Sequence, residues 1–103
     1  MKQTKNLSEL QDICKLVRRH IVEMTGAAKS GHPGGSLSAT EIVVTLFYDV
    51  MKHDPARPQW EDRDRFILSK GHACPVLYGV MAECGYTPVD QLKTLRQLGS
   101  IYQ

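Results

Sequence analysis

Residues 29–41, KSGHPGGSLSATE, hold three glycines, a proline and a histidine between two stretches with helical patterning. Glycine permits positive φ angles and a close approach of the backbone to a ligand, whereas Pro33 fixes φ beside His32. A helix that begins after this turn presents unpaired N–H groups and the positive end of its dipole. The turn therefore either holds His32 rigidly at the mouth of a ligand site or serves only as a tight connection between two helices.

A helix is expected on each side of this turn. Asn6 and Glu9 form a capping box before the first helix, and Gly26 is its expected end. The apolar face of this helix consists of Leu10, Ile13, Cys14, Val17, Ile21 and Met24. Ser38 and Glu41 form a second capping box before IVVTLFYDVMK, in which apolar residues cover almost every side. This second helix is expected to be buried by several neighbours.

The remaining elements follow a charged loop that contains two prolines. RFILS, residues 65–69, is short, apolar and bounded by polar residues, and it is the only convincing strand. The next helix is expected to run through Glu83, with Pro75 in its first turn and Gly85 at its end. A last helix is expected over residues 87–98.

Composition limits the function classes. The 103 residues are 42% hydrophobic and 23% charged, which is ordinary for a soluble globular chain. The net charge of +2 carries no dense basic block, so neither nucleic acid nor an anionic membrane is expected as a partner. The three cysteines have no CxxC spacing, and the N-terminus has no apolar signal segment. We expect a cytoplasmic protein with reduced thiols and no membrane span.

The pattern also predicts that the chain is part of something larger. A single strand has backbone donors and acceptors that need partner strands. The second helix is too apolar for a small independent bundle. We therefore expect either the first part of a larger α/β domain or a chain that pairs with another, and SIYQ at residues 100–103 ends where more chain would be expected.

A second turn repeats the pattern of the first. In SKGHA, Gly71 and His72 stand directly after the expected strand and before a helix, where open α/β sheets bind ligands. The alternative is an exposed histidine in a connector, and the two turns support each other only if the fold brings them together. A zinc site built from His32, His53, His72 and Cys74 matches no compact ligand spacing and is disfavoured. The carboxylates of residues 49–64 are expected to form a solvated surface.

Taken in order, residues 29–55 (KSGHPGGSLSATEIVVTLFYDVMKHDP) and 62–86 (DRDRFILSKGHACPVLYGVMAECGY) resemble the N-terminal part of transketolase, especially the N-terminal subunit of split transketolases. The resemblance runs from about residue 8 to Gly99. Deoxyxylulose-phosphate synthases are less similar because their second turn resembles DVGHQ rather than SKGHA. The resemblance implies an α/β fold, namely the N-terminal part of the thiamine diphosphate-binding fold with a parallel sheet flanked by helices. Residues 1–103 would be an incomplete portion of that domain, mostly helical with one clear strand.

The resemblance also implies a chemistry. Transketolases use thiamine diphosphate and usually Mg²⁺ to move a two-carbon ketol unit from a ketose phosphate to an aldose phosphate, a reaction of the pentose phosphate pathway. By the motif match, the catalytic residues would be His32, which binds the sugar substrate, and His72, which contacts the cofactor. Gly71 would belong to the cofactor-binding turn. Gly31, Gly34, Gly35 and Gly71 would shape the two turns.

Several parts of the transketolase pattern are missing from the sequence. It contains no GDG motif, which with a downstream asparagine holds the metal and the diphosphate in the family. It also lacks the pyrimidine-binding domain, which in split enzymes lies on a second polypeptide, and the third histidine turn expected beyond Gly99. We therefore expect a truncated segment, inactive alone, whose complete form binds sugar phosphates and assembles with a C-terminal subunit as a dimer. The alternative is a non-catalytic remnant that docks on transketolase subunits.

Overall fold

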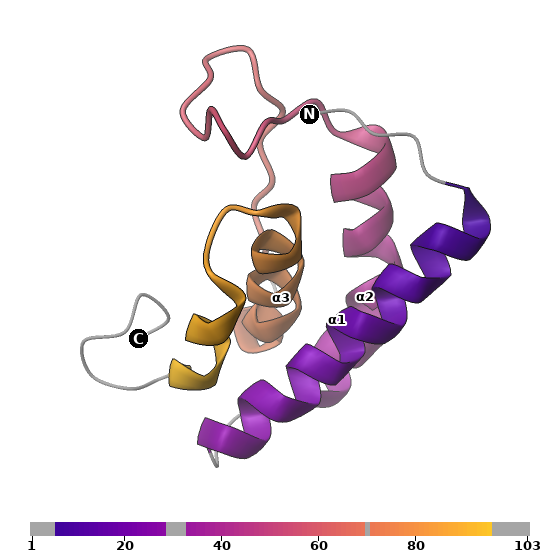
Figure 1. The fold of residues 1–103 in the computed structure, drawn as a ribbon, viewed down its shortest axis with the longest axis vertical. Helices are drawn as coiled ribbons and strands as arrows, with labels where there is room; N and C mark the ends of the chain where they lie inside the picture. Colours follow the sequence, from indigo (N-terminus) through magenta and orange to yellow (C-terminus); the bar gives the residue numbers. More distant parts are fainter. Residues whose placement is uncertain (1–5, 29–32, 70, 96–103) are drawn as a thin grey trace.

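The computed structural model describes residues 6–28, 33–69 and 71–95, apart from the side chain of residue 72. The described elements, in chain order, are α1 (Leu7–Ala28), α2 (Pro33–Thr45), the π-helical turn η1 (Leu46–Val50), the 3₁₀ turn η2 (Gly71–Ala73), α3 (Cys74–Cys84) and the 3₁₀ helix η3 (Val89–Thr94). The helices α1, α2 and α3 pack against one another, and the loop after η1 extends beyond one end of them (Figure 1).

The start of α1 confirms the predicted capping box. The Glu9 amide donates to Asn6 Oδ1 at 2.8 Å, and the Asn6 amide donates to Glu9 Oε1 at 3.2 Å. The expected end at Gly26 is wrong, because α1 continues to Ala28. A glycine is tolerated inside a helix at a cost of about 1 kcal/mol, which the buried face of a long helix can offset.

The helix α2 begins at Pro33 rather than after Ser38. Proline suits the first turn of a helix because its missing N–H would have no intrahelical partner there. Ser38 lies inside the helix and donates its Oγ hydrogen to the Gly35 carbonyl at 3.0 Å, so the predicted second capping box is wrong. The expected packing of this helix against several neighbours is confirmed by its contacts with α1 and α3, although one side stays open, since Ile42 is 65% exposed.

The predicted strand at residues 65–69 is not found: these residues belong to no strand, and the described part of the chain is helices, turns and loops. The segment still alternates like a strand, because Phe66 and Leu68 pack against the core whereas Ile67 is 86% exposed. A strand requires a ladder of hydrogen bonds to a neighbouring strand. No described segment supplies one, so the parallel sheet expected from the sequence lies outside what the described residues show.

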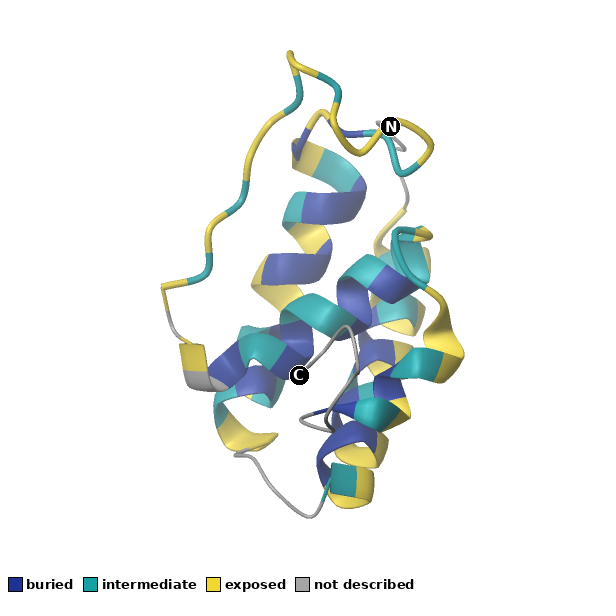
Figure 2. Ribbon diagram, turned by 90° about the vertical axis from the view of Figure 1, so that its left-hand side faces the viewer, coloured by how far each residue is buried: buried dark blue, intermediate teal, exposed yellow. Residues whose placement is uncertain are grey.

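The core lies where the three α-helices meet, and their facing sides are the buried ones (Figure 2). Its buried members include Val17, Ile21, Val43, Val44, Phe47, Val76 and Val80. Gly85 ends α3 as predicted, with a positive φ of 104° and its N–H directed to the Met81 and Ala82 carbonyls. Instead of the expected α-helix from residue 87, the chain forms the shorter η3, and residues 96–103 are outside the described part.

The length and composition of the described helices also decide whether any of them could cross a membrane. Among the described residues, no helix combines the length and the apolar composition that crossing a membrane requires.

Candidate functional site

One buried hydroxyl joins the start of α2 to the start of α3. Ser36, in the first turns of α2, donates its Oγ hydrogen to the Ala73 carbonyl at 3.0 Å. The same Oγ accepts the amide hydrogen of Val76 at 3.2 Å. Ser36, Ala73 and Val76 are all fully buried. The beginnings of α2 and α3, which lie about forty residues apart in sequence, are therefore adjacent in the fold.

The described members of the predicted site, namely Gly34, Gly35, Gly71 and the backbone of His72, lie at these two helix starts. His32 and Gly31 are not described. His72 lies within η2, directly before Ala73, and its side chain is not described. His32 directly precedes Pro33, the first residue of α2, in the sequence. His72 belongs to η2, and the carbonyl of Ala73, the last residue of η2, accepts the Ser36 hydroxyl hydrogen.

The glycines of these turns leave open space. Gly34 lies in the first turn of α2 and Gly71 begins η2, and a Cβ atom placed on either would meet no atom within 4 Å. Gly35 also lies in α2, and Gly85 has the one positive φ among the described glycines. Neither the backbone angle nor packing within the described chain therefore excludes a side chain at Gly34 or Gly71. This bare surface is suited to close approach by another group.

Backbone N–H groups at the start of a helix suit the phosphate of an organic cofactor. The start of α2 has such groups beside the exposed Gly34, and Gly71 is exposed at the start of η2. By contrast, the described residues contain no group of three or more histidine, cysteine or acidic side chains placed to hold a metal ion.

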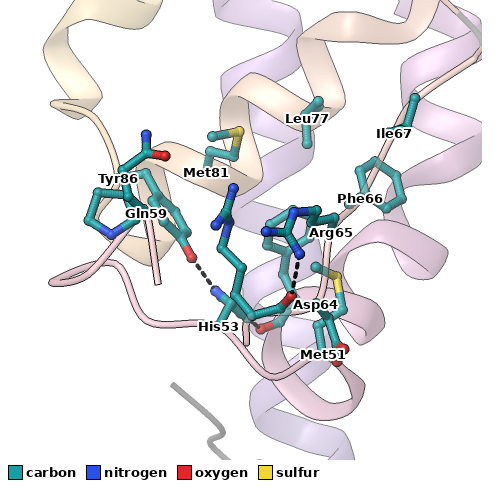
Figure 3. Close-up of a pocket in the computed structure, with 13 residues that line it drawn as sticks. Met51, His53, Gln59, Asp64, Arg65, Phe66, Ile67, Leu77, Met81 and Tyr86 are labelled. Atoms are coloured by element: carbon teal, nitrogen blue, oxygen red, sulfur yellow. Dashed lines mark hydrogen bonds between the residues drawn. The ribbon is translucent and has the colours of Figure 1, made fainter. Parts of the chain in front are cut away.

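His53 has a structural role that the sequence did not reveal. It is 2% exposed, and its Nε2 donates to the Phe47 carbonyl, which can only accept. Its Nδ1 therefore accepts the hydrogen of the Tyr86 hydroxyl at 2.5 Å, and Figure 3 shows that hydroxyl directed at the ring. Both ring nitrogens are used, so His53 is not available as the zinc ligand considered above.

A pocket of about 480 Å³ lies beside His53 (Figure 3), and Ser36, Ala73 and Val76 are not among the residues that line it. It separates the extended segment around Phe66 from α3, which contributes Leu77 and Met81. Its walls are mainly apolar, and both ring nitrogens of its lining residue His53 are already hydrogen-bonded. We assign it to packing rather than to the candidate site.

The loop carboxylates hold backbone rather than form an acid–base pair. Asp54 Oδ1 accepts the Ala56 amide at 2.9 Å, and that hydrogen bond lowers the pKa of the Asp54 carboxyl, with a further contribution from Arg57. Asp64 Oδ2 accepts the Lys52 amide at 2.7 Å. Arg57 also stacks over the Trp60 ring at 4.8 Å from its centre. These contacts shape the loop that leads to the second turn.

Known proteins are similar to this chain in sequence and in fold. Residues 10–102 match the sequence family described as "Transketolase, thiamine diphosphate binding domain". The chain belongs to this transketolase family. The resemblance expected from the two turns is thereby confirmed.

Individual transketolases are similar over nearly the whole chain. The chain is 42% identical over 93 residues to the 6-deoxy-6-sulfo-D-fructose transketolase subunit SqwG of Clostridium sp. (strain MSTE9), covering 90% of this chain and 34% of that protein. It is 43% identical over 94 residues to the transketolase of Mus musculus, covering 91% of this chain and 15% of that one. Among solved structures, the transketolase from Leishmania mexicana superimposes with a TM-score of 0.84 at 32% identity, covering 95% of this chain and 14% of that chain. The chain thus spans about a third or less of the transketolases it matches.

Proposed function

We propose that this chain supplies the histidine-bearing wall of a transketolase active site, where a two-carbon ketol unit passes from a ketose phosphate to an aldose phosphate. The observation that carries the proposal is the buried Ser36 hydroxyl, which holds the starts of α2 and α3 together beside the two histidine turns. The two histidine turns can border one site only if the starts of α2 and α3 are adjacent. Residues 1–103 would form an incomplete N-terminal portion of the transketolase domain, and the chain alone would be inactive.

The proposed roles follow from the chemistry of the imidazole. His32 would hydrogen-bond sugar oxygens and exchange protons with them, because a histidine gains and loses a proton near neutral pH. His72, with Gly71 beside it, would face the cofactor and border the path of the substrate. Thiamine diphosphate, when bound, would supply the electron sink that ketol transfer needs. The chain itself would position the sugar and the cofactor, exclude water from them, and move protons at the sugar oxygens.

The metal and the remaining partners would come from elsewhere. Because the sequence contains no GDG motif, Mg²⁺ would be bound by residues of the larger assembly. Exposed apolar side chains, Ile42, Val50 and Ile67 among them, are available for burial in such an assembly. We propose that the assembly includes a C-terminal transketolase section and is dimeric. A reducing compartment, the cytoplasm, suits the three free thiols of Cys14, Cys74 and Cys84.

A hybrid enzyme tests this function. Residues 10–102 would replace the aligned segment of transketolase 1 from Escherichia coli (strain K12), which is 38% identical over 95 residues. Ketol transfer would be measured from a ketose phosphate to an aldose phosphate. We expect the hybrid to be active and expect His32→Ala and His72→Ala each to lower kcat/KM by about 100-fold or more, the usual contribution of a positioned acid or base.

The matched control is Ser38→Ala, because the Ser38 hydroxyl is exposed and bonds only to the Gly35 carbonyl of its own helix. This variant should keep the kcat/KM of the unsubstituted hybrid. Full activity in both histidine variants would refute the site assignment. A folded hybrid that binds thiamine diphosphate but transfers no ketol unit would instead favour the non-catalytic alternative.

A further inference from the structure

The start of α3 has a capping deficit within its own sequence. Its N-cap residue is Ala73, which has no side-chain acceptor for the free N–H groups of the first turn. Pro75 removes one of those donors, since proline has no N–H. The Val76 N–H remains, and Val76 is fully buried, so water cannot satisfy this donor.

The missing acceptor comes from a different helix. Ser36 Oγ, on α2, accepts the Val76 amide hydrogen at 3.2 Å. It therefore satisfies the donor that an N-cap side chain of α3 itself would normally satisfy. The same hydroxyl donates its own hydrogen to the Ala73 carbonyl at 3.0 Å. Thr40 Oγ1 in turn donates to the Ser36 carbonyl at 3.0 Å, within a buried contact. Both the donor and the acceptor capacity of Ser36 are therefore directed at the backbone that follows His72.

We propose that Ser36 is a positioning residue for the second histidine turn. Ala73 is covalently next to His72, so the bond that fixes the Ala73 carbonyl also restricts the backbone from which the His72 side chain projects. Ser36 lies four residues after His32 in the sequence. One hydroxyl thus fixes the second turn relative to the start of α2. The role of this device in ketol transfer rests on the function proposed above.

The test uses the full 103-residue chain, labelled with ¹⁵N and ¹³C, without cofactor or substrate. Ser36→Ala should make hydrogen exchange at the Val76 amide about tenfold faster, the factor expected when a buried hydrogen bond of ordinary strength is lost. It should also shift the backbone and ring resonances of His72. Ser38→Ala is the matched control on the same helix, and it should leave the Val76 exchange rate and the His72 resonances unchanged.

Ser36→Thr keeps the hydroxyl and should preserve slow exchange at Val76, which separates the hydrogen bonds from a general loss of stability. If Ser36→Ala unfolds the chain, Ser36→Thr decides alone: fast exchange at Val76 in that variant refutes the proposal. Unchanged Val76 exchange and unchanged His72 resonances in a folded Ser36→Ala also refute it. These readouts need no catalysis, so an inactive hybrid enzyme would overturn the proposed function and leave this inference standing.

Discussion

Replacing Tyr86 by phenylalanine removes one atom from the buried contact that holds the loop between η1 and α3. The Tyr86 hydroxyl donates to His53 Nδ1 at 2.5 Å, and the two rings are stacked with centres 5.6 Å apart. Burial raises the pKa of Tyr86, so the hydroxyl keeps its hydrogen and serves as donor at neutral pH. Phenylalanine keeps the stacked ring, and the change therefore isolates the hydrogen bond.

The magnitude follows from the fixed tautomer of His53. Its Nε2 must carry the hydrogen because that nitrogen faces the Phe47 carbonyl. Phenylalanine offers Nδ1 no hydrogen, and the His53 residue is only 2% exposed. Leaving one buried acceptor unpaired costs about 1–3 kcal/mol. We expect Tyr86→Phe to lower the free energy of unfolding by about 2 kcal/mol, in the middle of that range.

Urea unfolding followed by circular dichroism measures this loss. The controls are His53→Leu and the double variant, which complete a double-mutant cycle. In the His53→Leu background, Tyr86→Phe should cost much less because the acceptor is already gone. An equal cost of Tyr86→Phe in both backgrounds, or no cost in either, would refute the assigned hydrogen bond and tautomer.

Three further outcomes follow from single residues. Gly85→Ala should destabilise the fold by about 1–2 kcal/mol in urea unfolding, because alanine rarely adopts the φ of 104° found at Gly85. Steric contact adds little, since the new Cβ would meet only Pro55, at 3.8 Å. Unchanged stability would contradict the left-handed helix end. Gly79→Ala, the same substitution inside α3, should stabilise the fold by up to about 1 kcal/mol, because its Cβ would lie 3.5 Å from Val17 Cγ1, an ordinary contact; a clear loss of stability would show that α1 and α3 pack more closely than described. Burial raises the pKa of the Cys84 thiol from 9.0 to about 11, so its alkylation by iodoacetamide at pH 8, followed by mass spectrometry, should be about 100-fold slower than that of the same peptide in urea. Equal alkylation rates in native buffer and urea would contradict the burial of Cys84. Because the pKa of Cys84 is higher in the folded chain than in the unfolded chain, its contribution to stability should be complete below pH 9.0 and be lost as the pH rises towards about 11.

Local signals in the sequence predicted some helix ends well and others badly. The capping box at Asn6 and the glycine end at Gly85 depend on residues within one turn, and both were confirmed. The start of α2 was placed too late because Ser38 and Glu41 also match a capping box, whereas Pro33 sets the true start. The strand at residues 65–69 failed for a different reason. Its alternating pattern is present, but a strand also needs hydrogen bonds to a neighbouring strand. The described residues include no such neighbour.

The candidate site was predictable in its motifs and not in its assembly. The two glycine-histidine turns identified the transketolase family from a single sequence, and the comparison with known families agrees. Nothing in the sequence marked Ser36, because a serine early in a helix usually serves its own backbone. Its contact with Ala73 and Val76 joins segments that no short-range pattern can relate. His53 was likewise considered only as a metal ligand, since its partners Phe47 and Tyr86 are distant in sequence.

The central claim is that the starts of α2 and α3 lie together and so place both histidine turns at one site. The most direct test is a nuclear Overhauser measurement between the Ser36 β protons and the Val76 amide proton in the labelled chain. The 3.2 Å separation of Ser36 Oγ and the Val76 nitrogen predicts a clear cross-peak. If both resonances are assigned and no cross-peak is present, the two turns are not held together, and the shared site proposed for them is contradicted.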